Sequence, residues 1–249
     1  LLPRRRNIGR SLARVRVGLW RSIGIALVTL VTGQAIGVLL GIYAATNQYK
    51  WGDKLATFVA LIGIVIPKFV VALIILYFLA FVWHSPYLGS LYSPEFQVQD
   101  GMSFAKLWDL FLHVWPVLLI SIWAGQAYTT RMMRGNLLDV MNAQYIETAR
   151  AKGLSRRKVL YKHAVPNALH PVIMNMGARF DYMIKGELEI AIVLGLPTLG
   201  PLIISAVSER DMYVVAAIFL LVAVLMVLGN LLADIALALL DPRVRKATV

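Results

Sequence analysis

Residues 145–166 read Tyr-Ile-Glu-Thr-Ala-Arg-Ala-Lys-Gly-Leu-Ser-Arg-Arg-Lys-Val-Leu-Tyr-Lys-His-Ala-Val-Pro, a polar and strongly basic stretch in a very apolar chain. The pattern predicts two short helices. The first runs from about Asp139 to Lys152 and ends at Gly153, because glycine is favoured where a helix closes with a left-handed residue. Ser155 is placed to cap the second helix, which we expect to continue until Pro166 redirects the chain. A rigid hairpin of this kind, here residues 139–165, is suited to be held by a cytosolic protein.

The composition around this hairpin is that of a membrane protein. Hydrophobic residues make up 59% of the 249 residues and the mean hydropathy is +0.71, whereas soluble domains contain about 45–50% apolar residues. Five segments reach the roughly 20 residues that a spanning helix requires: 22–46, 55–83, 107–127, 171–194 and 213–240. Because the polar–apolar alternation of a barrel strand is missing from the sequence, we expect an all-α polytopic membrane protein with about five spans.

The positive charge is distributed as in a membrane protein. The net charge is +12 and the pI about 10.1, but the basic residues lie in loops that flank the spans, so nucleic acid is not expected as a partner. The loop 128–170 holds eight Lys and Arg residues against two acids, which places it in the cytosol. The loops 84–106 and 195–212, poor in Lys and Arg, are then outside. The sequence contains no cysteine, which excludes thiol catalysis, cysteine-ligated metal and disulfides.

The N-terminal segment conflicts with this orientation. Residues 1–21 contain no acid, and counting spans places them outside the cell, although they carry seven arginines: Arg4, Arg5, Arg6, Arg10, Arg14, Arg16 and Arg21. One interpretation, which we favour, is an extracytoplasmic connector that follows a further span upstream of Leu1. The other is a basic amphipathic segment that lies along the membrane surface.

The fourth expected span, residues 171–194, carries five charged side chains: Arg179, Asp181, Lys185, Glu187 and Glu189. A charge at the centre of a spanning helix costs about 2.5–3.5 kcal/mol, so this helix is not expected to face lipid all round. Asp181, Lys185 and Glu189 recur at four-residue intervals and share one face of a helix, where ion pairs can form. Glu187 and Arg179 fall outside that face and are expected to meet a partner helix.

Two interpretations of these charges are open. Ion pairs could lock the helix to its neighbours, or some of the side chains could line a solute pathway, a common role of intramembrane charges.

Lys68 follows Pro67, a residue expected to kink the second span. Lys68 could reach a cavity or a carboxylate such as Glu187, or extend toward the membrane surface. His113 is expected to be a hydrogen-bonded structural residue, because no second ligand stands at metal-binding spacing.

The hairpin resembles a known signature, the EAA loop of ATP-binding-cassette (ABC) importer permeases. Glu147 and Ala149 are followed by Gly153 and then, thirteen residues later, by Pro166, as in that signature. Thr148 stands where the signature has its middle alanine, which replaces one small residue by another. In that family the loop docks into a cleft on the cytosolic ATPase.

Further stretches resemble the dipeptide, oligopeptide and nickel branch of these permeases. They are residues 149–154, 163–169, 230–234 and 240–243. His163 departs from the general signature, which has an apolar residue there, and is interpreted as a trait of the branch. The resemblance spans roughly residue 22 to the C-terminus. It implies the transmembrane domain of a type I ABC importer over residues 22–249, with residues 1–21 as a basic connector.

The resemblance also implies partners and site residues. The partners are a second homologous permease, two cytosolic ABC ATPase subunits, an extracytoplasmic solute-binding protein and the lipid of a bacterial cytoplasmic (inner) membrane. The residues expected at the ATPase contact are Glu147, Thr148, Ala149, Gly153, Leu154 and Pro166. The residues expected along the translocation pathway, which the fourth span borders in that family, are Lys68, Arg179, Asp181, Lys185, Glu187 and Glu189.

The sequence contains no recognisable catalytic motif. Because the phosphate-binding pattern Gly-x-x-x-x-Gly-Lys-Ser/Thr is missing, we expect no ATP hydrolysis by this chain. The resemblance implies that ATP and Mg bind to the partner ATPases and that this chain binds no cofactor. The resemblance implies a permease subunit that forms the solute pathway for peptides or similar small solutes, in a branch that also includes transporters for nickel, opines and some oligosaccharides. The alternative to an ABC importer permease is a stand-alone channel or secondary transporter that uses the intramembrane charges to couple ions. The EAA-like hairpin argues against this alternative, because such a protein does not need a docking site for an ATPase.

Overall fold

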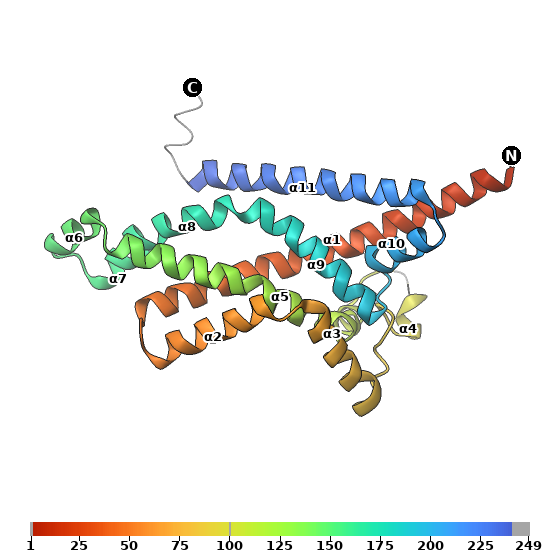
Figure 1. Cartoon of the computed structure of the whole chain (residues 1–249), viewed down its shortest axis with the longest axis horizontal. Helices are drawn as coiled ribbons and strands as arrows, with labels where there is room; N and C mark the ends of the chain where they lie inside the picture. Colours follow the sequence, from red (N-terminus) through yellow and green to blue (C-terminus); the bar gives the residue numbers. More distant parts are fainter. Residues whose placement is uncertain (1, 100, 241–249) are drawn as a thin grey trace, which may run out of the picture. The chain divides into compact units, whose positions relative to one another are not determined.

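The computed structural model describes residues 2–99 and 101–240, and the side chains of 14–99, 101–176, 179, 182, 184–232, 234 and 235. Every regular element in these residues is helical (Figure 1). The elements are α1 (Leu2–Thr46), α2 (Trp51–Val65), α3 (Lys68–Tyr77), the π-helix η1 (Phe78–Val82), α4 (Pro94–Gln97), α5 (Phe104–Met141), α6 (Gln144–Ala151), α7 (Arg156–Lys158), the π-helix η2 (Val159–Ala164), α8 (Val165–Met174), α9 (Met176–Leu194), α10 (Leu199–Ser208) and α11 (Met212–Leu240). The all-α prediction is confirmed.

Up to five membrane spans follow from the lengths and composition of these helices. Three continuous segments can each cross a membrane: Arg14–Thr46 of α1, α5, and Met212–Leu232 of α11. Two broken pairs can each form one more span, α2 with α3 and η1, and Ile184–Leu194 of α9 with α10. The expected number of about five spans agrees with this arrangement.

The predicted kink in the second span is a complete break. Helix α2 ends at Val65 and α3 begins at Lys68, with Pro67 in an extended conformation (φ −60°, ψ 135°). The ring of Pro67 removes a backbone donor, and its bulk disfavours helical geometry at Ile66. The local chemistry of one proline therefore accounts for the break.

The fourth span differs from its expected bounds. A continuous helix was expected over residues 171–194, but α8 ends at Met174, and the apolar pair suited to cross the membrane is 184–194 with 199–208, bent by 74°. Gly195 adopts a positive φ of 67° and Pro197 follows it, so α9 cannot continue. The expected external loop 195–212 accordingly contains helix α10.

The N-terminal residues expected to form a connector are helical. Helix α1 begins at Leu2 and continues through the first span to Thr46. Residue 21 is therefore not a structural boundary. The placement of this basic segment on the extracytoplasmic side of the membrane stays a prediction.

The described residues divide into two compact units. The first unit comprises residues 2–29, 66–122 and 182–225, and the second comprises residues 30–65, 123–181 and 226–240. The core of the first unit is built from α1, α3, α5 and α9, with buried side chains that include Ile25, Ala72, Val117, Ile120 and Ile190.

Small residues bring α1 and α5 together in the second unit. A Cβ atom placed on Gly37 would lie 2.7 Å from Cβ of Thr129, and one placed on Gly41 would lie 2.6 Å from Cβ of Met133. Both distances are shorter than van der Waals contact, so only glycine fits at these two positions. Close backbone approach through small residues is a usual means of packing membrane helices.

Candidate functional site

The turn at Gly153 has the geometry that the sequence predicts. Gly153 adopts a left-handed φ of 75°. Its N–H donates to the carbonyl oxygen of Arg150 at 2.9 Å, and the N–H of Leu154 donates to that of Ala149 at 3.4 Å. This pair of bonds is the Schellman motif, which satisfies the last carbonyls of a helix and fixes the direction in which the chain leaves it.

The first helix of the hairpin is shorter than expected. A single helix was predicted from about Asp139 to Lys152, but α5 runs to Met141 and α6 starts only at Gln144. The N–H of Asn142 closes a tight turn onto Asp139, and Ala143 is extended (φ −76°, ψ 145°). The spacing of apolar residues does not reveal this break, because both sides of it are helical.

The second helix of the hairpin does not end at Pro166, and that part of the prediction is wrong. Helix α7, the π-helix η2 and α8 follow one another directly from Arg156 to Met174, with Pro166 in the first turn of α8. A π-helical turn is wider than an α-helical one and changes the hydrogen-bond pattern. It ends at Ala164, two residues before the proline that has no N–H to donate, and so lets the helix accommodate Pro166.

Ser155 stands at the N-cap position of α7, as expected, with extended backbone angles of −60° and 148°. Among the described residues its hydroxyl makes no capping hydrogen bond to this helix. The position was therefore predicted correctly, and the bond was not.

The hairpin packs firmly against the rest of the second unit. Its buried side chains join α5 and α8 in one apolar cluster: Met133, Leu137, Ile146, Ala149, Val159, Ala164, Val165, Ala168 and Val172. Helices α6 and α7 extend from the end of α5 (Figure 1). The hairpin is therefore anchored to α5 and α8 on both sides of its exposed turn.

The expected coupling residues divide between the two faces of the hairpin. Glu147, Thr148, Gly153 and Pro166 are exposed. Ala149 is buried in the apolar cluster, and Leu154 packs against that cluster while half-buried. The exposed face also carries many basic groups: Arg150, Lys152, Arg156, Arg157, Lys158 and Lys162. Burial raises the pKa of the Tyr145 phenol in α6.

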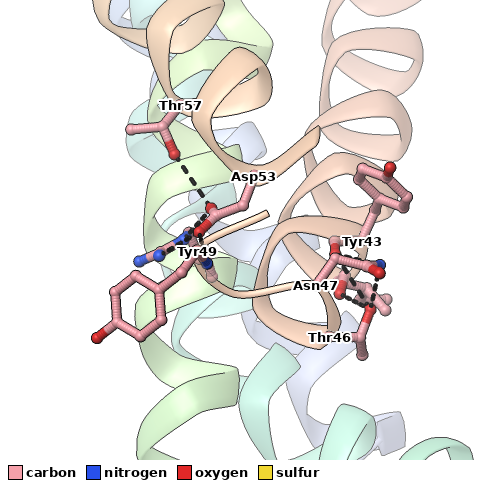
Figure 2. Close-up of polar contacts among 8 residues, drawn as sticks. Tyr43, Thr46, Asn47, Tyr49, Asp53 and Thr57 are labelled. Carbon is pink, nitrogen blue, oxygen red and sulfur yellow. Dashed lines mark hydrogen bonds and ion pairs between the residues drawn. The ribbon is translucent and has the colours of Figure 1, made fainter. Parts of the chain in front are cut away.

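A partly buried ion pair fixes the start of α2 to α5 near the hairpin. The Arg134 guanidinium donates from Nε to Oδ1 of Asp53 at 2.7 Å and from Nη2 to Oδ2 at 2.8 Å. The N–H of Tyr49 and the hydroxyl of Thr57 also donate to this carboxylate, as Figure 2 shows. The pair was not identified from the sequence, since Asp53 and Arg134 are 81 positions apart.

The turn between α1 and α2 is closed by side chains of its own. Thr46 Oγ1 donates to the carbonyl oxygen of Ile42 at 2.9 Å, and Asn47 Nδ2 donates to that of Tyr43 at 3.1 Å (Figure 2). These bonds satisfy terminal carbonyls of α1. The turn therefore presents α2, with Asp53 in its first helical turn, in a defined direction toward Arg134.

The charged residues of α9 do not share one environment. Lys185 and Glu189 are exposed one turn apart on the helix, whereas Glu187 between them is fully buried. The guanidinium carbon of Arg179 lies 3.6 Å from the centre of the Tyr128 ring, in the second unit. The side chain of Asp181 lies outside the described residues, so the predicted ladder of three charges stays a prediction.

Lys68 and Glu187 lie in the same unit but do not pair. Lys68 is buried at the start of α3, with its ammonium 3.7 Å from the centre of the Tyr182 ring and in contact with Gly186. Neither carboxylate oxygen of Glu187 accepts a hydrogen bond from a described residue. The hydroxyl groups of Ser22 and Thr198 lie beside this carboxyl group instead.

The segment 197–201 is a corner between α9 and α10, as its prolines suggest. It is held by α1, because Arg21 Nη1 donates to the carbonyl oxygen of Pro197 at 3.0 Å and the Leu199 N–H donates to Oγ of Ser22 at 3.1 Å.

His113 is structural, as expected: it is buried, and its Nδ1 lies 2.7 Å from the carbonyl oxygen of Asp109.

Comparisons with known proteins agree with these features. Residues 37–246 match the family "Binding-protein-dependent transport system inner membrane component". The oligopeptide transport system permease protein AppB of Bacillus subtilis (strain 168) is 35% identical over 88% of this chain and 67% of its own length. The oligopeptide transport system permease protein OppB of Haemophilus influenzae is 33% identical over 90% of this chain and 68% of its own length.

Solved structures show the same fold at low sequence identity. The MetNI methionine ABC transporter in an inward-facing conformation aligns with a TM-score of 0.66 at 16% identity, over 92% of this chain and 97% of that one. An amino acid ABC transporter crystallised with histidines aligns with a TM-score of 0.59 at 15% identity, over 95% and 97%. The chain therefore belongs to the family of inner membrane components of binding-protein-dependent transport systems, as a multi-pass permease of the ABC importer type.

Proposed function

We propose that this chain forms part of the pathway by which a bacterial ABC importer takes up peptides or similar small solutes. The proposed solute class follows from relatives that carry the name oligopeptide transport system permease. The complex would contain a second homologous permease, two cytosolic ATPase subunits and an extracytoplasmic solute-binding protein. ATP and Mg would bind to the ATPase subunits, with no cofactor on this chain.

The observation that carries the coupling role is the construction of the hairpin. One face is buried against α5 and α8, and the other presents Glu147 and Thr148 together with basic groups. A docking element must transmit force without deforming, and the apolar cluster and the turn at Gly153 meet this requirement. We assign the ATPase contact to Glu147, Thr148, Gly153 and Pro166, and a supporting role beneath it to Ala149 and Leu154.

The proposed cycle follows from this rigidity. Closure of the ATPase dimer on ATP moves the hairpin, the hairpin moves α5 and α8, and the spans open the solute cavity outward. Hydrolysis and release return the complex to the inward-open state. For the pathway we propose Lys185 and Glu189 as exposed lining groups, with Lys68, Arg179, Asp181 and Glu187 lining or supporting it.

A cross-linking experiment tests the docking role directly. Because the chain contains no cysteine, Thr148→Cys in the assembled complex can carry a single photo-crosslinker. We expect adducts with the ATPase subunit. Lys50→Cys is the matched control, since Lys50 is exposed in the turn between α1 and α2 and lies outside the hairpin.

Uptake completes the test. Reconstituted complex with its binding protein should accumulate a labelled tripeptide only when ATP is present on the ATPase side. Equal cross-linking from positions 148 and 50 would contradict the docking role. Peptide accumulation without ATP would contradict the ABC importer mechanism itself.

A further inference from the structure

An apolar cavity of about 500 Å³ lies within the first unit, where α1 and α5 run beside the segment that precedes α4. Its size falls in the range of about 300–1,000 Å³ typical of small-molecule sites. Residues of α1 at helical spacing form one wall, Gly24 and Val28 among them, and Leu107 and Leu118 of α5 stand in the other. The cavity therefore follows the two helices lengthwise.

One end of the cavity has the residue types of a membrane–water interface. The α1 span Arg14–Thr46 has 33 residues, about 50 Å of helix, which exceeds a hydrocarbon core of about 30 Å. Its first turns are therefore expected near the membrane surface. Trp20, 66% exposed, and Tyr92 line the cavity at this end, and aromatic residues of this kind are enriched at the level of lipid headgroups.

Two cations stand at the same end. Arg21 lines the cavity, and its Nη1 donates to the carbonyl oxygen of Pro197 at 3.0 Å. That bond uses one of the five N–H donors of the guanidinium group, so the group can bind a phosphate oxygen at the same time. The ammonium of Lys106 lies 5.2 Å from the centre of the Tyr92 ring. An apolar cavity with cations at its interfacial end is complementary to an amphiphile with a negatively charged head.

We propose that this cavity is a binding site for one membrane phospholipid, with an acyl chain between α1 and α5 and the phosphate on Arg21. Lys106 adds a preference for an anionic headgroup. Gly24 keeps the site open, because a Cβ atom placed there would meet no described atom within 4 Å. The surrounding membrane supplies phospholipid to this site, since the flanking segments of α1 and α5 are themselves suited to span the membrane.

The glycine supplies a precise test. Gly24→Leu places a bulky side chain in the cavity without a clash at Cβ, so the complex should assemble normally and bind less lipid. Gly135→Leu is the matched control, because Gly135 also lies in a helix with open space around it and does not line the cavity. Complexes in nanodiscs would be labelled with phosphatidylglycerol that carries a diazirine on its acyl chain. Adducts would be mapped by mass spectrometry.

We expect adducts in the peptides that contain residues 20–28 and 107–118, and a several-fold loss of these adducts in Gly24→Leu. The control should match the wild type. Arg21→Gln should weaken labelling by phosphatidylglycerol several-fold, and Lys106→Gln should reduce its advantage over phosphatidylcholine. Gly24→Ala, a smaller change, should give an intermediate loss if the larger variant assembles poorly.

Equal labelling of the Gly24→Leu and Gly135→Leu complexes would overturn the proposal. So would adducts spread evenly over the lipid-facing helices, which would indicate bulk lipid only. Removal of the adducts by saturating peptide solute would assign the cavity to the solute and not to lipid. The first two of these readings are independent of whether the complex transports peptides.

Discussion

Asp53 and Arg134 form a two-point ion pair, with Nε and Nη2 of the guanidinium 2.7 and 2.8 Å from the two carboxylate oxygens. The side chain of Asp53 is 5% exposed and that of Arg134 is 26% exposed. Arg134 lies in the part of α5 that leads into the hairpin, and Asp53 lies in the first turn of α2. The pair therefore links two helices of the second unit beside the element that we expect to contact the ATPase.

Loss of this pair should destabilise the permease. Arg134→Gln removes both hydrogen bonds to the charged carboxylate. A hydrogen bond to a charged group contributes about 1.5–3 kcal/mol to stability, but solvent screening lowers this value here because Arg134 is partly exposed. Arg134→Lys should be intermediate, because an ammonium cannot bind both oxygens in the same planar geometry. Arg131→Gln, at an exposed position one turn earlier, is the control. Thermal unfolding of the purified complexes gives the measurement, and equal melting temperatures for Arg131→Gln and Arg134→Gln would refute the prediction.

The turn at Gly153 should be essential for coupling. Its φ of 75° costs a residue other than glycine about 1–2 kcal/mol, and β-branched side chains fit that region worst. A Cβ there would meet no described atom within 4 Å, so a defect would come from backbone geometry or from the contact with the ATPase, and not from a clash within this chain. Gly153→Val should reduce solute-stimulated ATPase activity and uptake while membrane insertion persists. Gly153→Asn should retain most activity, and a Val variant with normal stimulation would sink the idea.

The close approach of α1 and α5 should tolerate no side chain at Gly41. A Cβ at this position would lie 2.6 Å from that of Met133 and 2.8 Å from the carbonyl oxygen of Thr130. Gly41→Leu should therefore separate the two helices, an overpacking effect of about 1–3 kcal/mol or more. The yield of assembled complex should fall, whereas Gly135→Leu should leave it unchanged. Similar yields for the two variants would show that the helices are not packed at this distance.

Local signals predicted the parts of the fold that depend on one or two residues. Pro67 breaks its helix, and Gly153 closes another, because backbone geometry is set by the residue itself. The resemblance of residues 147–166 to the EAA signature indicated the family correctly. Hydropathy located the three continuous spans, since their apolar length alone is sufficient.

Non-local relationships could not be predicted in this way. The partner of Asp53 is 81 positions distant, and no spacing rule identifies it. Glu187 is buried and Glu189 exposed, although both are glutamates on one helix, because burial depends on which neighbours pack against each face. Pro166 does not end its helix, since the π-helix before it changes the hydrogen-bond pattern around the missing donor.

The orientation of the spans can be tested with single cysteines in a chain that has none. Gln97→Cys and Glu209→Cys should react with an impermeant thiol reagent added to intact cells, because positive charge is sparse in those loops. Lys50→Cys and Arg156→Cys should not. All four positions are exposed in the structure, so burial does not confuse the result. External labelling of position 156 would reverse the whole orientation.

The charges of α9 distinguish a wet pathway from a dry structural contact. Lys185 and Glu189 are exposed on one face of the helix, and Glu187 is buried on another beside Ser22 and Thr198. In a dry contact, removal of one partner from an ion pair strands the other charge, at a cost of about 3–5 kcal/mol. In a pathway, water screens the charge that is left. Lys185→Met and Glu189→Gln should therefore leave complex yield unchanged and alter uptake rate or solute preference.

Glu187 supplies the matched comparison on the same helix. Glu187→Ala leaves a cavity beside Ser22 and Thr198 at a fully buried position, so it should lower the yield of complex. Yield and peptide uptake would be measured for this variant, for the two single variants and for Lys185→Met/Glu189→Gln together. If both single variants abolish assembly and the double variant restores it, Lys185 and Glu189 form a structural ion pair. The solute pathway would then have to lie along a different face of the permease.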